Sequence, residues 1–335
     1  MKRFLAFAMS LAALAATAAC HGEKDNGGRV VYVAGATVDA QGKYTATLWE
    51  NGVPKQLSKN YSEASSVCVS GGDVYVVGYE QYGTDQIYRP VLWTNGSPQY
   101  LPTETDLAEA ISVHVSGGNV YVAGLEEEDG YHRAKTWVNG LGRRLGTGIA
   151  LSTFASSGNV YAAGWVIDAS SERLVPMLWT NGEPQALATS DAVAASVFVS
   201  GGVVYVAGVE GTDFGGRAVL WTNGAAQRLG DQEDSEAHSV FVAGGNVYVA
   251  GFMTDSRGNG LPTVWKNGAA QRLESAHDAV AHSVYVSENG DVYAAGIETD
   301  GQYVARPRLW ENGVAQSLGG GTPGSLANCV FVKEK

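Results

Sequence analysis

Basic side chains are scarce in this chain. Its 335 residues contain 22 Lys and Arg against 34 Asp and Glu, which gives a formal net charge of −12. Binding to nucleic acid depends on a basic surface that neutralises phosphates. The composition therefore excludes nucleic acid as the expected partner.

Recognisable catalytic motifs are also lacking. The sequence contains no Gly-x-Ser-x-Gly elbow, no His-Glu-x-x-His metal motif and no phosphate-binding loop. We predict no catalytic residue, and a non-enzymatic role is favoured. Residues from separate loops could still assemble an active site, so an enzyme stays open as an alternative.

Only one long apolar run is present, over residues 4–16, and it is too short to span a bilayer comfortably. Lys2 and Arg3 precede it, and Thr17-Ala-Ala-Cys20 follows it. This pattern resembles the bacterial lipoprotein signal, in which a peptidase cuts before a cysteine that then carries lipid. Thr17 departs from the Leu, Val or Ile usual at its position. The alternative is an ordinary cleaved signal with an incidental Cys20.

These features predict three regions. We expect a signal peptide at 1–19, a lipid-attachment residue Cys20 with a short tether over 20–29, and a folded domain over 30–332. The protein would be exported and lipid-anchored to a bacterial membrane, in the periplasm or at the cell surface.

A unit of about 44 residues fills the folded domain. Each copy contains a Val-Tyr motif and, further on, a Trp followed one residue later by Asn-Gly. The Tyr residues are Tyr32, Tyr75, Tyr121, Tyr161, Tyr205, Tyr248 and Tyr293; the Trp residues are Trp49, Trp93, Trp137, Trp179, Trp221, Trp265 and Trp310. A period near 44 with several short strands per unit is typical of a β-propeller. The expected fold is an all-β, seven-bladed β-propeller.

Each unit predicts four antiparallel strands. They are an inner strand of the form Ala-x-Ser-Val-x-Val, a buried Val-Tyr-Val-Ala-Gly strand, a strand ending in Trp, and a short polar outer strand. Asn-Gly predicts a type I′ hairpin, and the Trp side chains should pack between blades. The chain begins with a second strand and ends with a first strand at 327–332. The C-terminal strand should therefore complete the N-terminal blade and close the ring.

Cysteine is rare, and only Cys68 and Cys329 lie in the domain. Cys329 aligns with Ser66, two residues before Cys68, so both thiols belong to the same strand face of their units. On neighbouring sheets one thiol then points toward its partner and the other away. We expect two buried free thiols.

The predicted hairpins sort the loops onto two faces. Gly-Gly and Asn-Gly turns, short and alike, lie on one face; the longer acidic loops, which differ between units, lie on the other, the variable-loop face. Variable loops on a rigid scaffold usually carry binding residues. Solubility is the alternative explanation of their charge. The candidate ligand contacts are the aromatic and imidazole side chains Trp165, Tyr131, His132, Tyr79, Tyr82 and Tyr303.

Histidines also recur at one place in the unit. His238 and His282 occupy equivalent positions in adjacent inner strands, and His277 and Asp278 precede His282. These four residues could bind a divalent metal, although hydrogen-bonded histidines in a polar channel are the favoured interpretation. Otherwise no cofactor is expected.

The repeated unit Leu-Trp-x-Asn-Gly…Val-Tyr-Val-Ala-Gly resembles one found in uncharacterised bacterial exported proteins, many of them lipoproteins. The resemblance covers Val30 to Val332 and implies a propeller without known active residues. The expected function is a monomeric envelope binding module for a protein or glycan. The alternatives are an enzyme acting on carbohydrate and a scaffold in envelope assembly.

Overall fold

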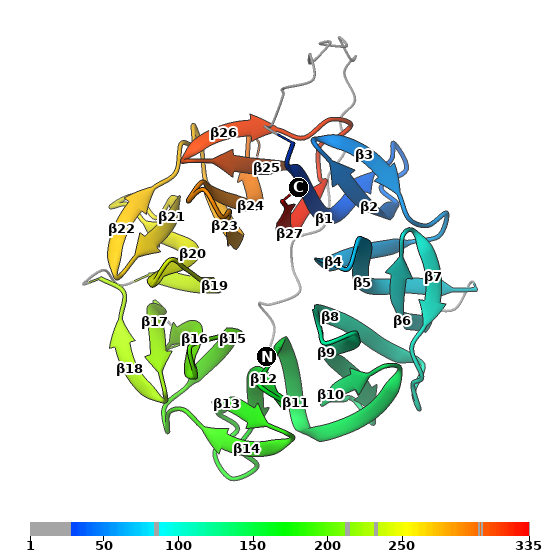
Figure 1. Cartoon of the computed structure of the whole chain (residues 1–335), viewed down its shortest axis with the longest axis vertical. Helices are drawn as coiled ribbons and strands as arrows, with labels where there is room; N and C mark the ends of the chain where they lie inside the picture. Colours follow the sequence, from blue (N-terminus) through cyan, green and yellow to red (C-terminus); the bar gives the residue numbers. More distant parts are fainter. Residues whose placement is uncertain are drawn as a thin grey trace.

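A computed structural model describes residues 28–83, 87–211, 215–230, 234–300, 302 and 304–334. All regular elements in these ranges are β-strands, and the sheets are arranged around a common axis, as in a β-propeller (Figure 1). Within these ranges no helix is long and apolar enough to cross a membrane. Cys20 and the predicted signal peptide lie outside the described residues.

The strands fall into antiparallel groups of four. The first sheet contains β27 (Leu326–Lys333), β1 (Val30–Val38), β2 (Tyr44–Glu50) and β3 (Val53–Gln56). Three further four-stranded sheets contain β15 (Ala192–Ser200), β16 (Val203–Glu210), β17 (Arg217–Thr222) and β18 (Ala225–Arg228); β19 (Ser235–Ala243), β20 (Asn246–Thr254), β21 (Gly260–Lys266) and β22 (Ala269–Arg272); and β23 (Ala279–Val286), β24 (Val292–Thr299), β25 (Ala305–Glu311) and β26 (Val314–Ser317).

The remaining sheet has eleven strands and joins three such groups. It contains β4 (Ser62–Ser70), β5 (Asp73–Tyr82), β6 (Ile87–Thr94), β7 (Ser97–Tyr100), β8 (Leu107–Ser116), β9 (Asn119–Glu128), β10 (Tyr131–Val138), β11 (Leu141–Ser156), β12 (Asn159–Ile167), β13 (Leu174–Thr180) and β14 (Glu183–Ala186). A single parallel pair, Tyr88 with Leu107, links β6 to β8. Strand β11 pairs with β10 through its first half and with β12 through its second. The sequence predicted two separate strands here; the connection is so short that the backbone stays extended.

Strand β27 pairs with β1 along seven residue pairs, from Val30 with Lys333 to Ala36 with Leu326. Figure 1 shows the red C-terminal strand beside the blue N-terminal one. The two ends of the described chain therefore share one sheet, as the order of strands in the sequence predicts.

The predicted turns and tryptophans are confirmed. Asn51 and Gly52 have φ angles of 49° and 80°, and the other Asn-Gly pairs are similar, as a type I′ turn requires. The Asn side chain also accepts a bond from the second strand, for example from Val31 N at 2.9 Å. Each of the seven repeat Trp residues has an exposed fraction of 0 or 1%. Trp49 packs against Tyr293 and Leu309 of the neighbouring sheet, so these rings join adjacent blades.

The glycine that ends Val-Tyr-Val-Ala-Gly has a steric cause. A Cβ placed on Gly78 would lie 1.8 Å from the Glu63 carbonyl oxygen of the inner strand. The register of β4 against β5 shifts between Ala64 and Ser66, so a β-bulge lies beside this close approach. The other inner strands carry the same bulge at the equivalent position.

In six of the seven inner strands, the serine after the bulge connects neighbouring blades. Its hydroxyl oxygen accepts a hydrogen bond from a backbone N–H of the next inner strand, at 3.1 to 3.3 Å. The six inner serines are Ser66, Ser112, Ser152, Ser196, Ser239 and Ser283. Cys329 occupies this position in β27, where its Sγ lies 3.8 Å from the Val67 carbonyl oxygen and 3.9 Å from Ser66 Oγ.

Both described cysteines are free, as predicted. Cys68 is buried, and burial raises its thiol pKa to about 11. Cys329 differs from the prediction in keeping partial exposure: it lies two residues before the strand position at which Cys68 packs in a hydrophobic cluster.

Cys329 also generates a stability prediction. Replacing it by serine should supply the missing inter-blade hydrogen bond between β27 and β4 and raise the free energy of unfolding by about 0.5–1.5 kcal/mol. Ser196→Ala, which removes the bond to Val240 N, should lower it by about 1–3 kcal/mol. Urea unfolding of both variants measures these changes. A loss of stability in Cys329→Ser would contradict the role assigned to this position.

Candidate functional site

The predicted aromatic contacts lie on hairpins of three consecutive blades. Tyr79 and Tyr82 are on β5, Tyr131 and His132 on β10, and Trp165 on β12. Tyr82 and Tyr131 are 51% and 57% exposed. His132 and Trp165 are half-buried. Tyr303 lies outside the described residues.

Trp165 occupies a recurring position rather than an exceptional one. It directly follows the glycine of the second strand, as do Tyr79 and Phe252. Each of these residues has a cross-strand partner on the inner strand: Trp165 pairs with Ile149 and Tyr79 pairs with Glu63. This position therefore directs large side chains toward the inner strands at the variable-loop end.

Tyr79 belongs to a cluster of four tyrosines that the sequence analysis missed. The rings of Tyr79 and Tyr88 lie 5.4 Å apart, and Tyr61 lies 6.5 Å from Tyr79 and 5.9 Å from Tyr44. All four are half-buried. Tyr44 and Tyr61 come from the first blade and the loop that follows it, and no regular spacing in the repeat marks them.

Glu63 connects this cluster to the axis. It accepts hydrogen bonds from the Tyr79 hydroxyl at 3.2 Å and from Asn328 Nδ2 at 2.8 Å. Burial raises the pKa of the Glu63 carboxyl. Glu109 occupies the equivalent position in the next inner strand. Burial, and then the charge of Glu63, raise the Glu109 pKa to about 7. Two coupled carboxyl groups therefore lie beside the tyrosines.

Two of the bulge residues form side-chain hydrogen bonds to the neighbouring blade. His282 Nδ1 donates to the Ala327 carbonyl at 3.1 Å, and Asn328 Nδ2 donates to the Ala64 carbonyl at 3.0 Å. His238 instead binds Glu236 at 3.0 Å. The rings of His238 and His282 lie 5.8 Å apart. Burial and the nearby His238 lower the His282 pKa to about 4, which keeps this ring neutral near pH 7.

The predicted metal site is not formed in the described ranges. No group of three or more His, Cys, Asp or Glu side chains there has an arrangement that could hold a metal ion. The His277 backbone N–H binds Glu298 at 3.2 Å, while its side chain is exposed. Asp278 Oδ1 accepts a bond from Gly260 N at 2.5 Å. These bonds fix the loop in place, which explains why this His-Asp pair does not join the inner histidines.

Many of the acidic side chains in the loops form hydrogen bonds that hold the loops in place. Asp39, Asp168, Asp255 and Asp300 each accept two backbone N–H bonds within their own turn, for example Asp255 from Arg257 and Asn259 at 2.8 and 2.9 Å. Three buried glutamates, Glu80, Glu126 and Glu298, hold the loops between blades. The acidic composition is therefore weak evidence for a cationic ligand.

Glu126 has the densest set of partners. Its carboxylate is fully buried, forms an ion pair with buried Lys135, and accepts a bond from Arg144 Nε at 3.1 Å. Burial opposes the ionised form, but the bonds from Lys135 and the Glu104 backbone prevail and lower the Glu126 pKa. The hairpin that carries Tyr131 and His132 is thus anchored at its base.

A chain of aromatic rings lines the inner strands. Neighbouring centroids lie 4.1 to 4.9 Å apart along the series His114, Phe154, Phe198, Phe241, Tyr285 and Phe331. Cys68 holds the same position in β4 and packs in one cluster with Phe331. The inner wall is therefore largely apolar at this level, whereas Glu63, Glu109, His238 and His282 lie nearer the variable loops.

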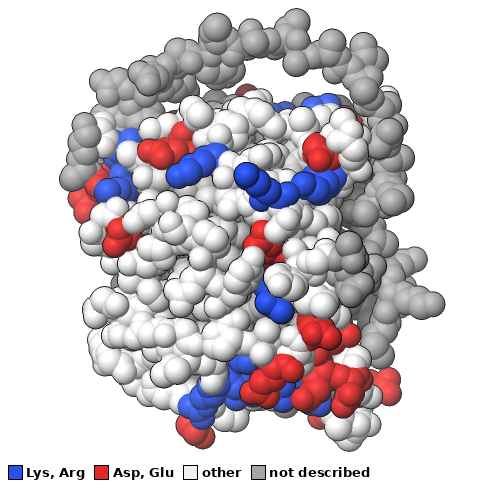
Figure 2. Space-filling view, turned by 90° about the vertical axis from the view of Figure 1, so that its right-hand side faces the viewer, with Lys and Arg blue, Asp and Glu red and all other residues white. Residues whose placement is uncertain are grey.

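Charge on the outside is mixed. On the side of the molecule shown in Figure 2, Lys and Arg side chains are interspersed with Asp and Glu, and acidic side chains gather at the lower edge. No extended basic area is seen on this side.

No protein-family model and no curated protein matches the chain. Among solved structures, the chain is similar to the β-propeller domain of the trilobed protease from Pyrococcus furiosus, with a TM-score of 0.53, 11% identity, and coverage of 87% of this chain and 92% of that one. It is also similar to acylaminoacyl peptidase from Pyrococcus horikoshii (TM-score 0.54, 14% identity, 87% of this chain and 50% of that one). The chain thus spans about half the length of that peptidase. At such identities the likeness establishes a β-propeller and nothing about activity.

Glu109 generates a pH prediction. Its pKa rises from an ordinary 4.5 to about 7 on folding, so its contribution to stability is fully present below pH 4.5 and is lost as the pH rises through about 7. The free-energy difference between wild type and Glu109→Gln should therefore shift by about 1–2 kcal/mol against the wild type between pH 4.5 and pH 8, less than the full shift implies because the carboxyl keeps some contact with solvent.

Unfolding in urea at several pH values measures this difference. Glu183→Gln, on an exposed outer strand, is the matched control and should show no such trend. A difference between wild type and Glu109→Gln that is constant with pH would contradict the assignment.

Proposed function

We propose that the chain is a cell-envelope binding module that takes a protein or glycan ligand on its variable-loop face. The observation that carries the proposal is the unequal chemistry of the two faces. Tyr82 and Tyr131 are exposed at variable hairpins, and Trp165 is half-buried on the hairpin of the next blade, whereas the other face presents repeated Gly-Gly and Asn-Gly turns. Aromatic anchors commonly supply most of the energy of an interface.

The scaffold in this proposal is a closed ring of seven blades. The seven repeats, the pairing of β27 with β1 and the six serine bonds between inner strands support it. Closure removes the open edges that a solenoid would have to cap. The Cys329→Ser variant also tests closure. In an open ring β27 and β4 would not be joined, so the new hydroxyl would have no inter-blade partner to stabilise.

A screen of envelope extracts and of a glycan array with the full-length protein would identify the ligand. Trp165→Ala should then weaken binding by more than about 1 kcal/mol. Trp179→Ala, at a buried position between blades, should instead lower the free energy of unfolding by about 3–5 kcal/mol. Titration and urea unfolding separate the two effects.

Glu183→Lys, on an exposed outer strand directly after the Asn181-Gly182 turn, is the control for the opposite face and should bind as wild type. If Glu183→Lys abolished binding while Trp165→Ala left it intact, the working face would be the other one.

The envelope location rests on the N-terminal pattern. Cys20 would carry lipid, and a bacterial lipoprotein needs several acyl chains for stable anchoring. Cys20→Ala should release the protein from the membrane fraction, as fractionation and immunoblotting would measure. Retention of the variant after a high-salt wash would show that lipid on Cys20 is not the anchor.

A carbohydrate-active enzyme is the second candidate, and the coupled pair Glu63 and Glu109 favours it. A carboxyl group with a pKa near 7, such as that of Glu109, is partly protonated at neutral pH and could donate a proton to a glycosidic oxygen. Release of reducing ends from a polysaccharide, abolished in Glu109→Gln, would distinguish catalysis from binding alone.

A further inference from the structure

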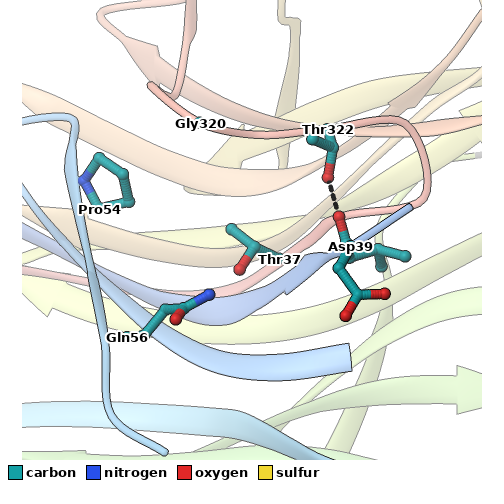
Figure 3. Close-up of a pocket in the computed structure, with 7 residues that line it drawn as sticks. Thr37, Asp39, Pro54, Gln56, Gly320 and Thr322 are labelled. Carbon is teal, nitrogen blue, oxygen red and sulfur yellow. Dashed lines mark hydrogen bonds between the residues drawn. The ribbon is translucent and has the colours of Figure 1, made fainter. Parts of the chain in front are cut away.

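A groove of about 500 Å³ lies where the first sheet meets the loop that leads into β27. Three segments form it: the end of β1 with Asp39, the outer strand β3, and residues 320–322. Figure 3 shows Thr37, Gln56, Pro54 and Asp39 around this space, with Gly320 and Thr322 above them. These segments are far apart in sequence and meet because β27 pairs with β1.

The walls of the groove are held by hydrogen bonds that do not involve the Gln56 side-chain amide. Both backbone groups of Val38 bind the loop: its N–H donates to Ser325 Oγ at 3.2 Å, and its carbonyl accepts the Thr322 hydroxyl (Figure 3). Gly319 N donates to the Gly52 carbonyl at 2.9 Å, and the Trp49 indole donates to the Gly319 carbonyl at 2.7 Å. The groove is therefore preformed, which lowers the entropic cost of binding.

The open groups suit a neutral ligand. Gln56 is exposed, and its amide both donates and accepts. The hydroxyls of Thr37 and Thr322 are already hydrogen-bonded, to Thr47 Oγ1 and to the Val38 carbonyl, while Pro54 and Val38 provide apolar surface. The lining contains no Lys or Arg and one carboxylate, Asp39, so it disfavours anions. It also contains no aromatic ring for a flat ligand, and one carboxylate is too few for a calcium ion.

We propose that this groove binds one sugar unit of a neutral glycan. A pyranose presents hydroxyl groups that can pair with the Gln56 amide and the remaining Asp39 oxygen, and a C–H face that can lie against Pro54. The volume falls in the range of small-molecule sites, about 300–1,000 Å³. This inference deepens the proposed function by naming a ligand class, and it rests on the proposal that the variable-loop side of the molecule binds ligands.

The test is calorimetric titration of the full-length protein, in a detergent without a sugar head group. The probes are glucose, galactose, mannose, N-acetylglucosamine and the disaccharides cellobiose and lactose, with glucuronate as the anionic comparison. At least one neutral probe should bind, and more tightly than glucuronate. Gln56→Ala should weaken that binding by about tenfold, the effect of leaving a ligand hydroxyl unpaired.

Two further variants sharpen the test. Gln56→Glu keeps the size of the side chain but replaces the amide with a second carboxylate near Asp39, so it should weaken binding at least as much as Gln56→Ala. Gln185→Ala, on the exposed outer strand of another blade, is the matched control and should bind as wild type. Because Gln56 is exposed, all three variants should melt at the wild-type temperature.

Three results would overturn the inference: no neutral probe binds, glucuronate binds more tightly, or Gln56→Ala binds as wild type. Its failure differs from failure of the proposed function. If Trp165→Ala abolishes binding of an envelope ligand while no neutral sugar binds, the groove is wrong and the proposed function stands. If sugar binding is lost in Gln56→Ala but Trp165→Ala has no effect on any ligand, the groove stands and the aromatic face is wrong.

Discussion

The hydrogen bond from a backbone N–H of one inner strand to the serine hydroxyl of its neighbour is the interaction on which this architecture depends. Strands within a blade share backbone bonds, but neighbouring blades are joined mainly by side chains. The serine sits directly after a bulge, and the bulge faces a glycine whose missing Cβ lets the inner strand approach. Serine, bulge and glycine therefore act together in six of the inner strands, and in β27 Cys329 takes the place of the serine.

That arrangement leaves two kinds of position free to vary. One is the bulge residue, which is His282 or Asn328 in two of the repeats. The other is the residue before the alanine that precedes the bulge, which is Glu63 or Glu109 in two others. Some of these residues add a further bond between blades, as His282 and Asn328 do. Others place a partly buried carboxyl group beside the tyrosines, as Glu63 and Glu109 do. The bulge position thus joins blades in two of the repeats, whereas the position before the alanine carries a partly buried carboxyl group in two others.

The variable loops are also more ordered than their composition indicates. Asp255 and Asp300 close their own turns, and Glu126 and Glu298 bind loops from below. These hydrogen bonds give the carboxylates a structural role, so acidic composition alone does not indicate a ligand site. Exposed aromatics such as Tyr131, and open amides such as that of Gln56, consequently distinguish possible binding surfaces better than charge does.

Apart from the two expected strands that are continuous in β11, the sequence by itself determined the strands, their order, the type I′ turns and the buried tryptophans, because each is set by contacts that recur in every repeat. It also placed Cys68 and Cys329 as free thiols, since parity along a strand follows from the chain alone. Only the tertiary structure brought together Tyr44, Tyr61, Tyr79 and Tyr88, separated His277 from His282, and made a groove from Gln56 and Thr322. Those arrangements join residues from different repeats, so no periodic signal records them, and they exist because the sheets pack side by side and β27 returns to β1.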